Sequence, residues 1–253
     1  MNRPFIMVAP NGARRGKEDN ASLPIRIPEL VATATSCQQA GADALHLHVR
    51  DAQGRHSLDV GLYREATQEL AKQAPQLEVQ ITTEAAGIFD VTEQFTCLRD
   101  LQPKWASISI REMARDLTLA PKVYDLCAEQ GTKVQHIIYN TDDIKLLLDW
   151  QKQNIVRATQ DSVLFVLGRY SQGQISSPAD LVPFRDALPD IENWMVCAFG
   201  PEEHNCLANA AQQGGAVRVG FENSLVSSNG EPHIDNAASV AALIKTIEQL
   251  KHG

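Results

Sequence analysis

Short apolar segments rich in valine and isoleucine alternate eight times with longer amphipathic segments along the 253 residues. Strands separated by helices pair in parallel, because a parallel connection needs a crossover of a dozen or more residues. Eight such units in about 250 residues are typical of the (β/α)8 TIM barrel, an α/β fold. The expected strands are Phe5–Ala9, Ala44–Val49, Glu78–Thr83, Trp105–Ile110, Thr132–Ile138, Ser162–Leu167, Trp194–Ala198 and Ala216–Phe221.

The amphipathic segments predict helices between these strands. Their expected spans are about 28–41, 59–74, 91–101, 121–129, one capped by Thr141, one capped by Ser177 with Pro178 at its first position, one ending at Gly214, and 236–250. No linker or low-complexity segment divides the chain, so we expect a single domain over residues 1–253. The main rival is an open doubly wound sheet, which usually carries a GxGxxG turn after its first strand. The segment 11–15, Asn-Gly-Ala-Arg-Arg, lacks that pattern.

Composition narrows the range of partners. The net charge of -8 and the pI of about 5.4 disfavour nucleic acid and anionic membrane surfaces as partners. An anionic small molecule would therefore need a local cluster of arginine or lysine. The five cysteines are odd in number and form no CxxC pair, which predicts reduced thiols in a cytoplasmic protein. No signal peptide or membrane span is expected from the apolar pattern.

The segment Leu45-His46-Leu47-His48-Val49 carries two histidines two positions apart. Residues i and i+2 of a strand point to the same side. At the carboxyl end of a barrel strand that side is the mouth, where such enzymes place their active sites. Two neutral imidazoles there can bind one divalent metal. The alternative is a pair of polar residues on a solvated strand face, which the apolar flanking residues disfavour.

A catalytic zinc usually has three protein ligands and one open position, so we expect a third ligand from another strand end. Arg218, Gly220 and Glu222 share one face at the end of the last expected strand. Gly220 leaves room beside that face, and Glu222 could then reach across the mouth. Glu222 could also be a plain surface carboxylate. His136, near the end of the fifth expected strand, is a competing ligand or a buried barrel histidine.

Other side chains at strand ends are candidates for binding substrate or moving protons. A buried Arg218 is costly unless it is paired, either with Glu222 or Asp51 or with a substrate carboxylate. The remaining candidates are Arg14 and Arg15 as charges that attract an anion, Thr82 and Thr83 as hydroxyl donors, and Glu84 and Glu112 as bases or ion-pair partners. Each of them could also serve the structure alone.

Three segments taken together resemble the β-keto acid cleavage enzyme family. They are Ala9-Pro10-Asn11-Gly12-Ala13, then Ala40-Gly41-Ala42 leading into His46-x-His48-x-Arg50-Asp51, and finally Arg218-Val219-Gly220-Phe221-Glu222-Asn223. The resemblance runs from the first strand to the eighth and so covers nearly the whole chain. The HxH strand combined with the RVGxE strand is more specific than either alone.

The resemblance implies a zinc-dependent barrel that condenses a β-keto acid with acetyl-CoA and releases acetoacetate and the CoA thioester of the remaining acyl chain. By this resemblance, His46, His48 and Glu222 are ligands of Zn²⁺, or of another divalent metal, which polarises the keto oxygen. Thr82 would hold the substrate carboxylate, and Arg218 would orient the catalytic group and the substrate. The implied route removes a proton at C2, attacks acetyl-CoA, transfers CoA within the adduct and breaks the chain by a retro-Claisen step. The resemblance also implies a homo-oligomer, specifically a homotetramer.

The proton acceptor departs from the family pattern. Asn223 stands where the family carries an aspartate proposed as the base. An amide cannot accept a proton usefully near pH 7. Either Glu84, Glu112 or His136 is the base, or Asn223 has only a positioning role.

Two further departures concern the substrate. Arg14 stands where the family carries a glutamate that binds a substrate ammonium group. Such a reversal of charge would reject an amino-substituted chain, so we expect a neutral or anionic tail. Glu84-Ala85 replaces a pair of glycines after the third strand, which could alter carboxylate binding there.

Two other classes of function stay open from the residues alone. A metal-dependent hydrolase or an aldolase-type lyase also uses HxH on a TIM barrel, although amidohydrolase-like barrels usually carry it on the first strand. A barrel that binds a small anion without catalysis is the third reading. Gly200-Pro201 could receive one CoA phosphate at a helix start, or could be a plain helix cap.

Overall fold

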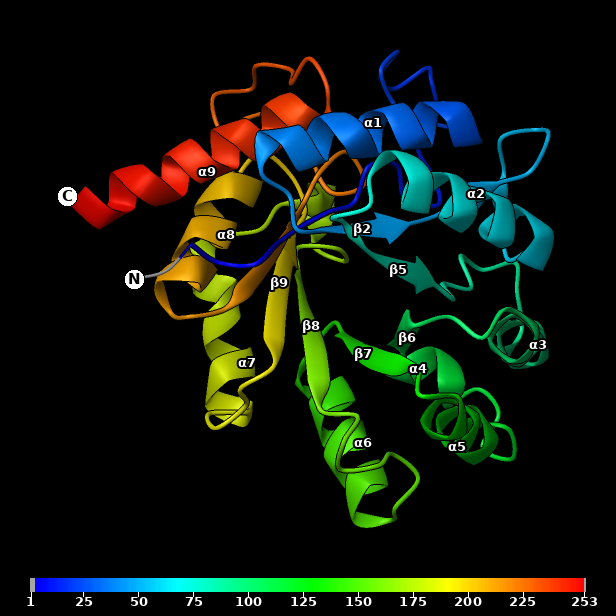
Figure 1. Ribbon diagram of the computed structural model, residues 1–253. Helices are drawn as coiled ribbons and strands as arrows, with labels where there is room; N and C mark the ends of the chain where they lie inside the picture. Colours follow the sequence, from blue (N-terminus) through cyan, green and yellow to red (C-terminus); the bar gives the residue numbers. More distant parts are fainter. Residues whose placement is uncertain (1–2, 253) are drawn as a thin grey trace.

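The computed structural model describes residues 3–252, with side chains through residue 250, so Met1, Asn2 and Gly253 of the predicted domain lie outside the described residues. Eight parallel strands of the described chain close into a barrel in the order β1-β10-β9-β8-β7-β6-β5-β2, with helices between successive strands (Figure 1). The predicted (β/α)8 TIM barrel is confirmed. The barrel strands are β1 (Ile6–Val8), β2 (Ala44–Leu47), β5 (Glu78–Thr82), β6 (Trp105–Ser109), β7 (Lys133–Ile138), β8 (Ser162–Leu167), β9 (Trp194–Ala198) and β10 (Ala216–Val219).

The helices cover the outside of the barrel. They are α1 (Ile27–Ala40), α2 (Val60–Gln73), α3 (Val91–Leu101), α4 (Ile110–Met113), α5 (Ala120–Gln130), α6 (Thr141–Lys152), α7 (Val182–Ala187), α8 (Glu203–Gln212) and α9 (Asn236–His252), with 3-10 turns η1 (Gln172–Gln174) and η2 (Pro178–Leu181). Helices α1 and α9, the first and last along the chain, pack side by side (Figure 1).

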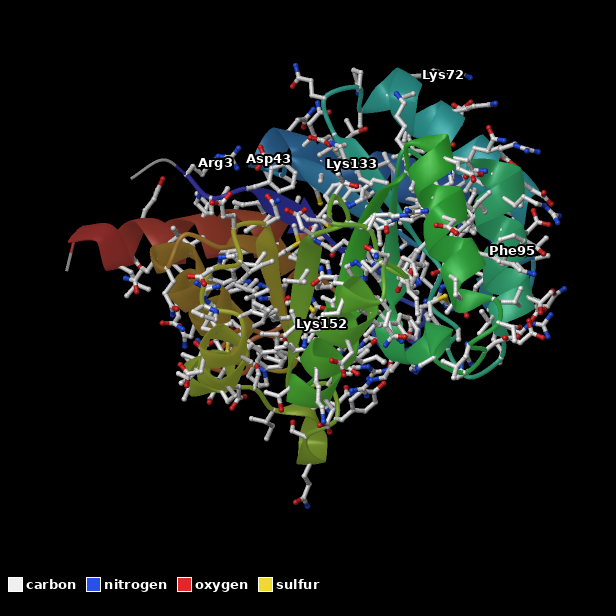
Figure 2. All side chains as sticks on the ribbon, turned by 90° about the horizontal axis from the view of Figure 1, so that it is seen from below. Arg3, Asp43, Lys72, Phe95, Lys133 and Lys152 are labelled. Carbon is white, nitrogen blue, oxygen red and sulfur yellow. The ribbon has the colours of Figure 1, made fainter. Side chains whose placement is uncertain are left out.

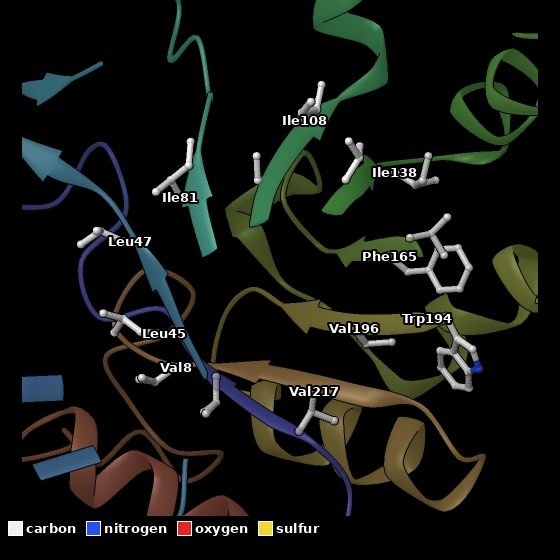
Figure 3. Packing of buried hydrophobic residues seen from close by; sticks show 14 of the residues in the cluster. Val8, Leu45, Leu47, Ile81, Ile108, Ile138, Phe165, Trp194, Val196 and Val217 are labelled. Carbon is white, nitrogen blue, oxygen red and sulfur yellow. The ribbon is translucent and has the colours of Figure 1, made fainter. Parts of the chain in front are cut away.

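Alternation along the strands builds two apolar layers. Side chains such as Leu45, Leu47 and Phe165 point from the strands toward the helices and form the outer layer (Figure 3). The other face of each strand fills the barrel. A smaller apolar cluster there includes Met7 and Met195. Near it lie buried polar side chains that form hydrogen bonds with one another. Gln80 donates to Gln135, and Ser107 donates to Thr82. Thr82, the last residue of β5, lines the cavity at the mouth of the barrel.

The predicted strand Ala44–Val49 is wrong at its end. Strand β2 stops at Leu47, and Val49–Arg50 forms β3, which pairs antiparallel with β4 (His56–Ser57). Arg50 explains the break, because its buried guanidinium donates to the carbonyl of Gly12, in the loop after β1, and to that of Gly54, in the turn between β3 and β4. His48 therefore lies between two short strands.

The predicted strand Ala216–Phe221 also ends early. Strand β10 stops at Val219, and Gly220 has a φ of 137°, a conformation that L side chains rarely adopt. The expectation that Arg218, Gly220 and Glu222 share one strand face is therefore wrong. A turn places Glu222 instead, with its amide donating to the carbonyl of Ala9.

Three smaller corrections concern helix starts. Ile110 begins α4 rather than ending a strand. Asn140, not Thr141, caps α6, because its side-chain oxygen accepts from the amides of the first helical turn. Ser177 and Pro178 do open a capped segment, but it is the 3-10 turn η2, and α7 follows it.

The outer face of the helical layer is polar. Lys72 on α2 and Lys152 on α6 carry exposed ammonium groups, and Lys133 does so at the start of β7 (Figure 2). Arg3 and Asp43 form an ion pair that links the residues before β1 to those before β2 (Figure 2). Within residues 3–252, no helix combines the length and apolar character needed to cross a membrane.

Candidate active site

A cavity of about 120 Å³ opens at the carboxyl ends of the barrel strands. Residues that follow six of the eight barrel strands contribute to it, together with residues from within the strands. The lining residues are Asn11, Gly12, Ala13, Arg14, Arg15, His46, Thr82, Glu84, Ile137, Tyr139, Val166, Arg169, Gln174, Phe199, Arg218 and Glu222. The cavity lies at the end of the barrel where TIM-barrel enzymes place their active sites.

Two imidazoles and one carboxylate meet at this mouth. The Nε2 atoms of His46 and His48 are 3.1 Å apart. Each of these nitrogens is 3.7 Å from a different oxygen of Glu222. One ligand atom from each residue lies within 4.8 Å of the others. The structure thus brings together the three residues that the sequence suggested as metal ligands.

Hydrogen bonds fix the orientation of both imidazoles. His46 Nδ1 is 2.8 Å from Gln80 Oε1, an acceptor, so Nδ1 carries the proton. His56 Nε2 donates to the carbonyl of Glu84, and His48 Nδ1 lies 3.5 Å from the other nitrogen of His56. His48 Nδ1 is then the donor to His56. Both Nε2 lone pairs are left facing Glu222, as ligating histidines require.

The electrostatics of the cluster fit a divalent cation. Burial lowers the pKa of His46 and of His48 well below the usual range, so both imidazoles are neutral and can donate a lone pair. Glu222 Oε2 is buried without a hydrogen-bond partner. A buried carboxylate oxygen that lacks a partner is costly, and a cation between the three side chains would satisfy it.

Arg218 pairs with Glu222 rather than with Asp51. Its Nη2 is 3.6 Å from Glu222 Oε1 and 3.5 Å from Cys197 Sγ, whereas Asp51 pairs with Arg55. The Nε and Nη1 atoms of Arg218 are buried without a partner. Because Arg218 also lines the cavity, it can present two charge-assisted donors to an anion bound there.

The Arg14 guanidinium is paired across the mouth. Arg14 Nη1 lies 2.7 Å from Glu84 Oε1, and Thr82 Oγ1 accepts the amide of Glu84. All three residues line the cavity. Part of the positive charge that the sequence assigned to this position is therefore compensated by Glu84.

Three other candidates lie away from the cavity. The Thr83 hydroxyl donates to the carbonyl of Ser107, and Glu112 accepts the amide of Ala85. His136 points toward the helices, where its Nε2 donates a hydrogen bond to the carbonyl of Gln160. The interpretation of His136 as a competing metal ligand is wrong for this reason, and its alternative as a buried barrel histidine holds.

Sequence reasoning missed Glu203, which lies directly behind the mouth. Its Oε1 accepts the amide of Gly220 and the side-chain Nδ2 of Asn223. Asn223 also donates to the carbonyl of Arg218, and it does not line the cavity. Glu203 belongs to the first turn of α8, where a glutamate usually faces solvent. Nothing in the residues around it therefore predicted that this carboxyl would be buried.

We expect Glu203 to make stability depend on pH. Burial raises the pKa of its carboxyl to about 8 from 4.5, so the folded protein holds a proton that the unfolded chain has released. As the pH rises from 4.5 to 8, the free energy of unfolding of the native chain should therefore fall relative to that of Glu203→Gln, by up to about 1.4 kcal/mol per pH unit. Urea unfolding of both proteins across this range measures the difference. Parallel pH profiles would contradict the burial of this proton.

Arg169 was also missed. It follows Gly168 at the end of β8 and lines the cavity, where its guanidinium lies over the ring of Phe199 at 5.0 Å. Its position directly after a barrel strand was the available signal. Gly200-Pro201, considered from the sequence as a phosphate site, does not line this cavity.

The closed parallel barrel, with a neutral imidazole pair, a carboxylate and a partly unpaired arginine at its mouth, defines the chain as a TIM-barrel enzyme. Comparison with protein families identifies which one. The model of the beta-keto acid cleavage enzyme family matches residues 4–252, and the chain belongs to that family. It is an enzyme of acyltransferase type that cleaves carbon–carbon bonds.

Named relatives agree over nearly their full lengths. The chain is 26% identical to the 3-keto-5-aminohexanoate cleavage enzyme of Fusobacterium nucleatum subsp. nucleatum, over 99% of this chain and 93% of that protein. It is 28% identical to the 3-oxoadipate:acetyl-CoA acetyltransferase of Cupriavidus necator, over 98% of this chain and 90% of that protein.

Solved structures confirm the fold. The apo structure of ObcA has a TM-score of 0.70 and 15% identity, covering 92% of this chain, and the chain spans 62% of ObcA. A type I 3-dehydroquinate dehydratase from Clostridium difficile has a TM-score of 0.67 and 10% identity, covering 100% of this chain and 94% of that one. At these identities the likeness concerns the barrel alone.

Proposed function

We propose that the protein is a zinc-dependent β-keto acid cleavage enzyme that uses acetyl-CoA as co-substrate and forms acetoacetate and an acyl-CoA. The observation that carries the proposal is the cluster of His46, His48 and Glu222 beside the unpaired edge of Arg218. The names of the relatives supply the acetyl-CoA dependence. Two nitrogens and one carboxylate oxygen are a common ligand set of catalytic zinc.

Different residues at the mouth would bind the metal, hold the substrate and accept its proton. A divalent metal, when bound by the cluster, would polarise the keto group and acidify C2 of the substrate. Arg218 would hold substrate oxygens through Nε and Nη1, and Thr82 would offer its hydroxyl to the substrate carboxylate. Of the three bases considered from the sequence, Glu84 is the one that lines the cavity, so we assign the C2 proton to its carboxylate. Asn223 would position Glu203 and the turn at Gly220.

We also propose that the substrate carries a neutral or anionic tail. Four arginines and two glutamates line the cavity, so an ammonium group would meet a positive field there. We expect kcat/KM for a six-carbon β-keto acid with a carboxylate tail to exceed that for a chain with an amino tail by about 100-fold or more, since unfavourable charge contacts cost several kcal/mol.

The test is to incubate the purified, zinc-loaded protein with acetyl-CoA and a panel of β-keto acids that end in methyl, carboxylate or ammonium, and to measure acetoacetate. Formation that depends on acetyl-CoA is the expected result. Turnover without acetyl-CoA would favour a hydrolase or an aldolase-type lyase. A lack of product with every tail would contradict the proposed reaction.

A cytoplasmic location and a homo-oligomer complete the proposal. The five cysteines are free and buried, which suits a reducing compartment. The homotetramer rests on the family resemblance, and light scattering of the purified protein would test it. We propose small-molecule substrates alone as partners, with no nucleic acid and no membrane, in line with the net charge of -8.

A further inference from the structure

Two arginines of the cavity have no carboxylate partner. Arg14 and Arg218 lie within 4.0 Å of Glu84 and Glu222, respectively. Arg15 and Arg169 line the same cavity and form no ion pair among the side chains of residues 3–250. A guanidinium carries five donors and a permanent charge, so these two residues hold unused capacity for an anion.

Their present contacts orient the guanidinium groups without neutralising them. Arg15 donates to the backbone carbonyls of Phe221 and Asn223. Arg169 makes no side-chain hydrogen bond within the described residues, and its guanidinium lies over the rings of Phe199 at 5.0 Å and Tyr170 at 5.9 Å. Stacking of this kind fixes the plane of the group and leaves its N–H edge free.

The positive charges of Arg15 and Arg169 also repel one another. Burial lowers the pKa of Arg15, and the neighbouring charge of Arg169 lowers it further. The carboxylates of Asp19 and Glu222 act in the opposite direction, but each lies beyond ion-pair distance of Arg15. An anion bound between two such guanidinium groups relieves their repulsion and gains charge-assisted hydrogen bonds from both.

We infer that Arg15 and Arg169 form the binding site for the carboxylate at the far end of a dicarboxylic β-keto acid. The inference rests on the proposed function and names the residues that select its substrate. Arg14, which the sequence favoured for this role, is already held by Glu84. Arg14 is therefore assigned a structural role, and Arg15 and Arg169, which have no carboxylate partner, are assigned to the substrate tail.

The phosphates of acetyl-CoA offer the same anionic chemistry, so the experiment must separate the two sources. Arg15→Met and Arg169→Met each keep an unbranched apolar stem and remove the guanidinium group with its charge. Arg185→Met is the matched control, because Arg185 also stacks on an aromatic ring, that of Trp194 at 4.5 Å, but lies on α7 outside the cavity. KM is measured for acetyl-CoA and for two six-carbon β-keto acids, one ending in a carboxylate and one in a methyl group.

We expect Arg15→Met and Arg169→Met to raise KM for the carboxylate-tailed acid by about 10- to 100-fold, the effect of losing one charge-assisted hydrogen bond. KM for the methyl-tailed acid and for acetyl-CoA should change by less than about twofold in Arg169→Met, and Arg185→Met should change none of the three. Arg15 also donates to the carbonyls on either side of Glu222, so for Arg15→Met the readout is the ratio of KM for the carboxylate-tailed acid to KM for the methyl-tailed acid, which should rise by about 10- to 100-fold. A rise in KM for acetyl-CoA alone would assign the pair to a coenzyme phosphate and overturn the inference. Equal changes for both tails would overturn it as well.

Direct binding keeps this test independent of turnover. Adipate and hexanoate, which lack the keto group, can be titrated into the zinc-loaded native protein and the same variants by calorimetry. Adipate should bind the native protein more tightly than hexanoate does, and each arginine variant should lose that advantage. This result would stand even if no acetoacetate forms, in which case the proposed reaction fails and the carboxylate site remains. Equal binding of the two acids by the native protein would remove the site whatever the activity.

Discussion

Replacement of His46, His48 or Glu222 with alanine should lower kcat/KM by about 10³-fold or more, together with loss of bound metal. The three side chains converge within 4.8 Å, the Nε2 atoms of both imidazoles face Glu222, and Glu222 Oε2 has no hydrogen-bond partner. A metal at such a site supplies several kcal/mol of stabilisation to developing negative charge, and about 1.4 kcal/mol corresponds to a tenfold change in rate. Elemental analysis of the purified variants and acetoacetate formation measure the two losses.

A control histidine and a chelator complete this experiment. His136→Gln should retain metal and activity, because His136 is buried on the helix side of β7 and bonds to the carbonyl of Gln160. Treatment of the native protein with a strong chelator should abolish activity, and Zn²⁺ should restore it. A metal-free native protein with full activity would contradict the assignment of the cluster.

The sequence predicted the barrel and the pairing of His46 with His48 because both rest on local patterns. Alternation of strands and helices follows from hydrophobic periodicity, and the spacing of His46 and His48 needs only the two-residue repeat of a strand. His136 shows the limit of the same reasoning. Periodicity places it opposite Gln135 and Ile137 across the strand, but both sets have apolar neighbours, so the sequence alone does not tell which set faces the barrel.

Residues placed by turns and loops were harder to predict. Glu222 reaches the two histidines through a turn at Gly220, not through strand alternation, so its predicted proximity to them rested on the wrong geometric reason. The buried Glu203 carboxyl accepts the amide of Gly220 from that turn and the side-chain Nδ2 of Asn223. Arg169 depends on the path of the loop after β8, which periodicity does not describe. Such positions follow from tertiary contacts that no local pattern encodes.

The loop after β1 lies against Glu222, so we expect the second large effect from a substitution at Gly12. Gly12 has a φ of +60°, and a Cβ there would lie 2.6 Å from Cγ of Glu222, far inside van der Waals contact. Gly12→Ala should therefore displace Glu222 while leaving the histidines in place. We expect metal affinity to fall by about 10- to 100-fold or more, as when the support of a ligand is lost, with a parallel fall in activity.

Backbone strain alone must be separated from this steric effect. Gly131, which ends α5, has a φ of +71° with no atom within 4 Å of a built Cβ, so Gly131→Ala carries the same left-handed strain without the clash. Gly131→Ala should lose about 1 to 2 kcal/mol of unfolding free energy through backbone strain, and Gly12→Ala at least as much because of the added clash. Only Gly12→Ala should release zinc in a titration with a chromophoric chelator. Equal zinc affinity in the two variants would mean that Glu222 is not held against Gly12, and that the carboxylate reaches the imidazoles by another path.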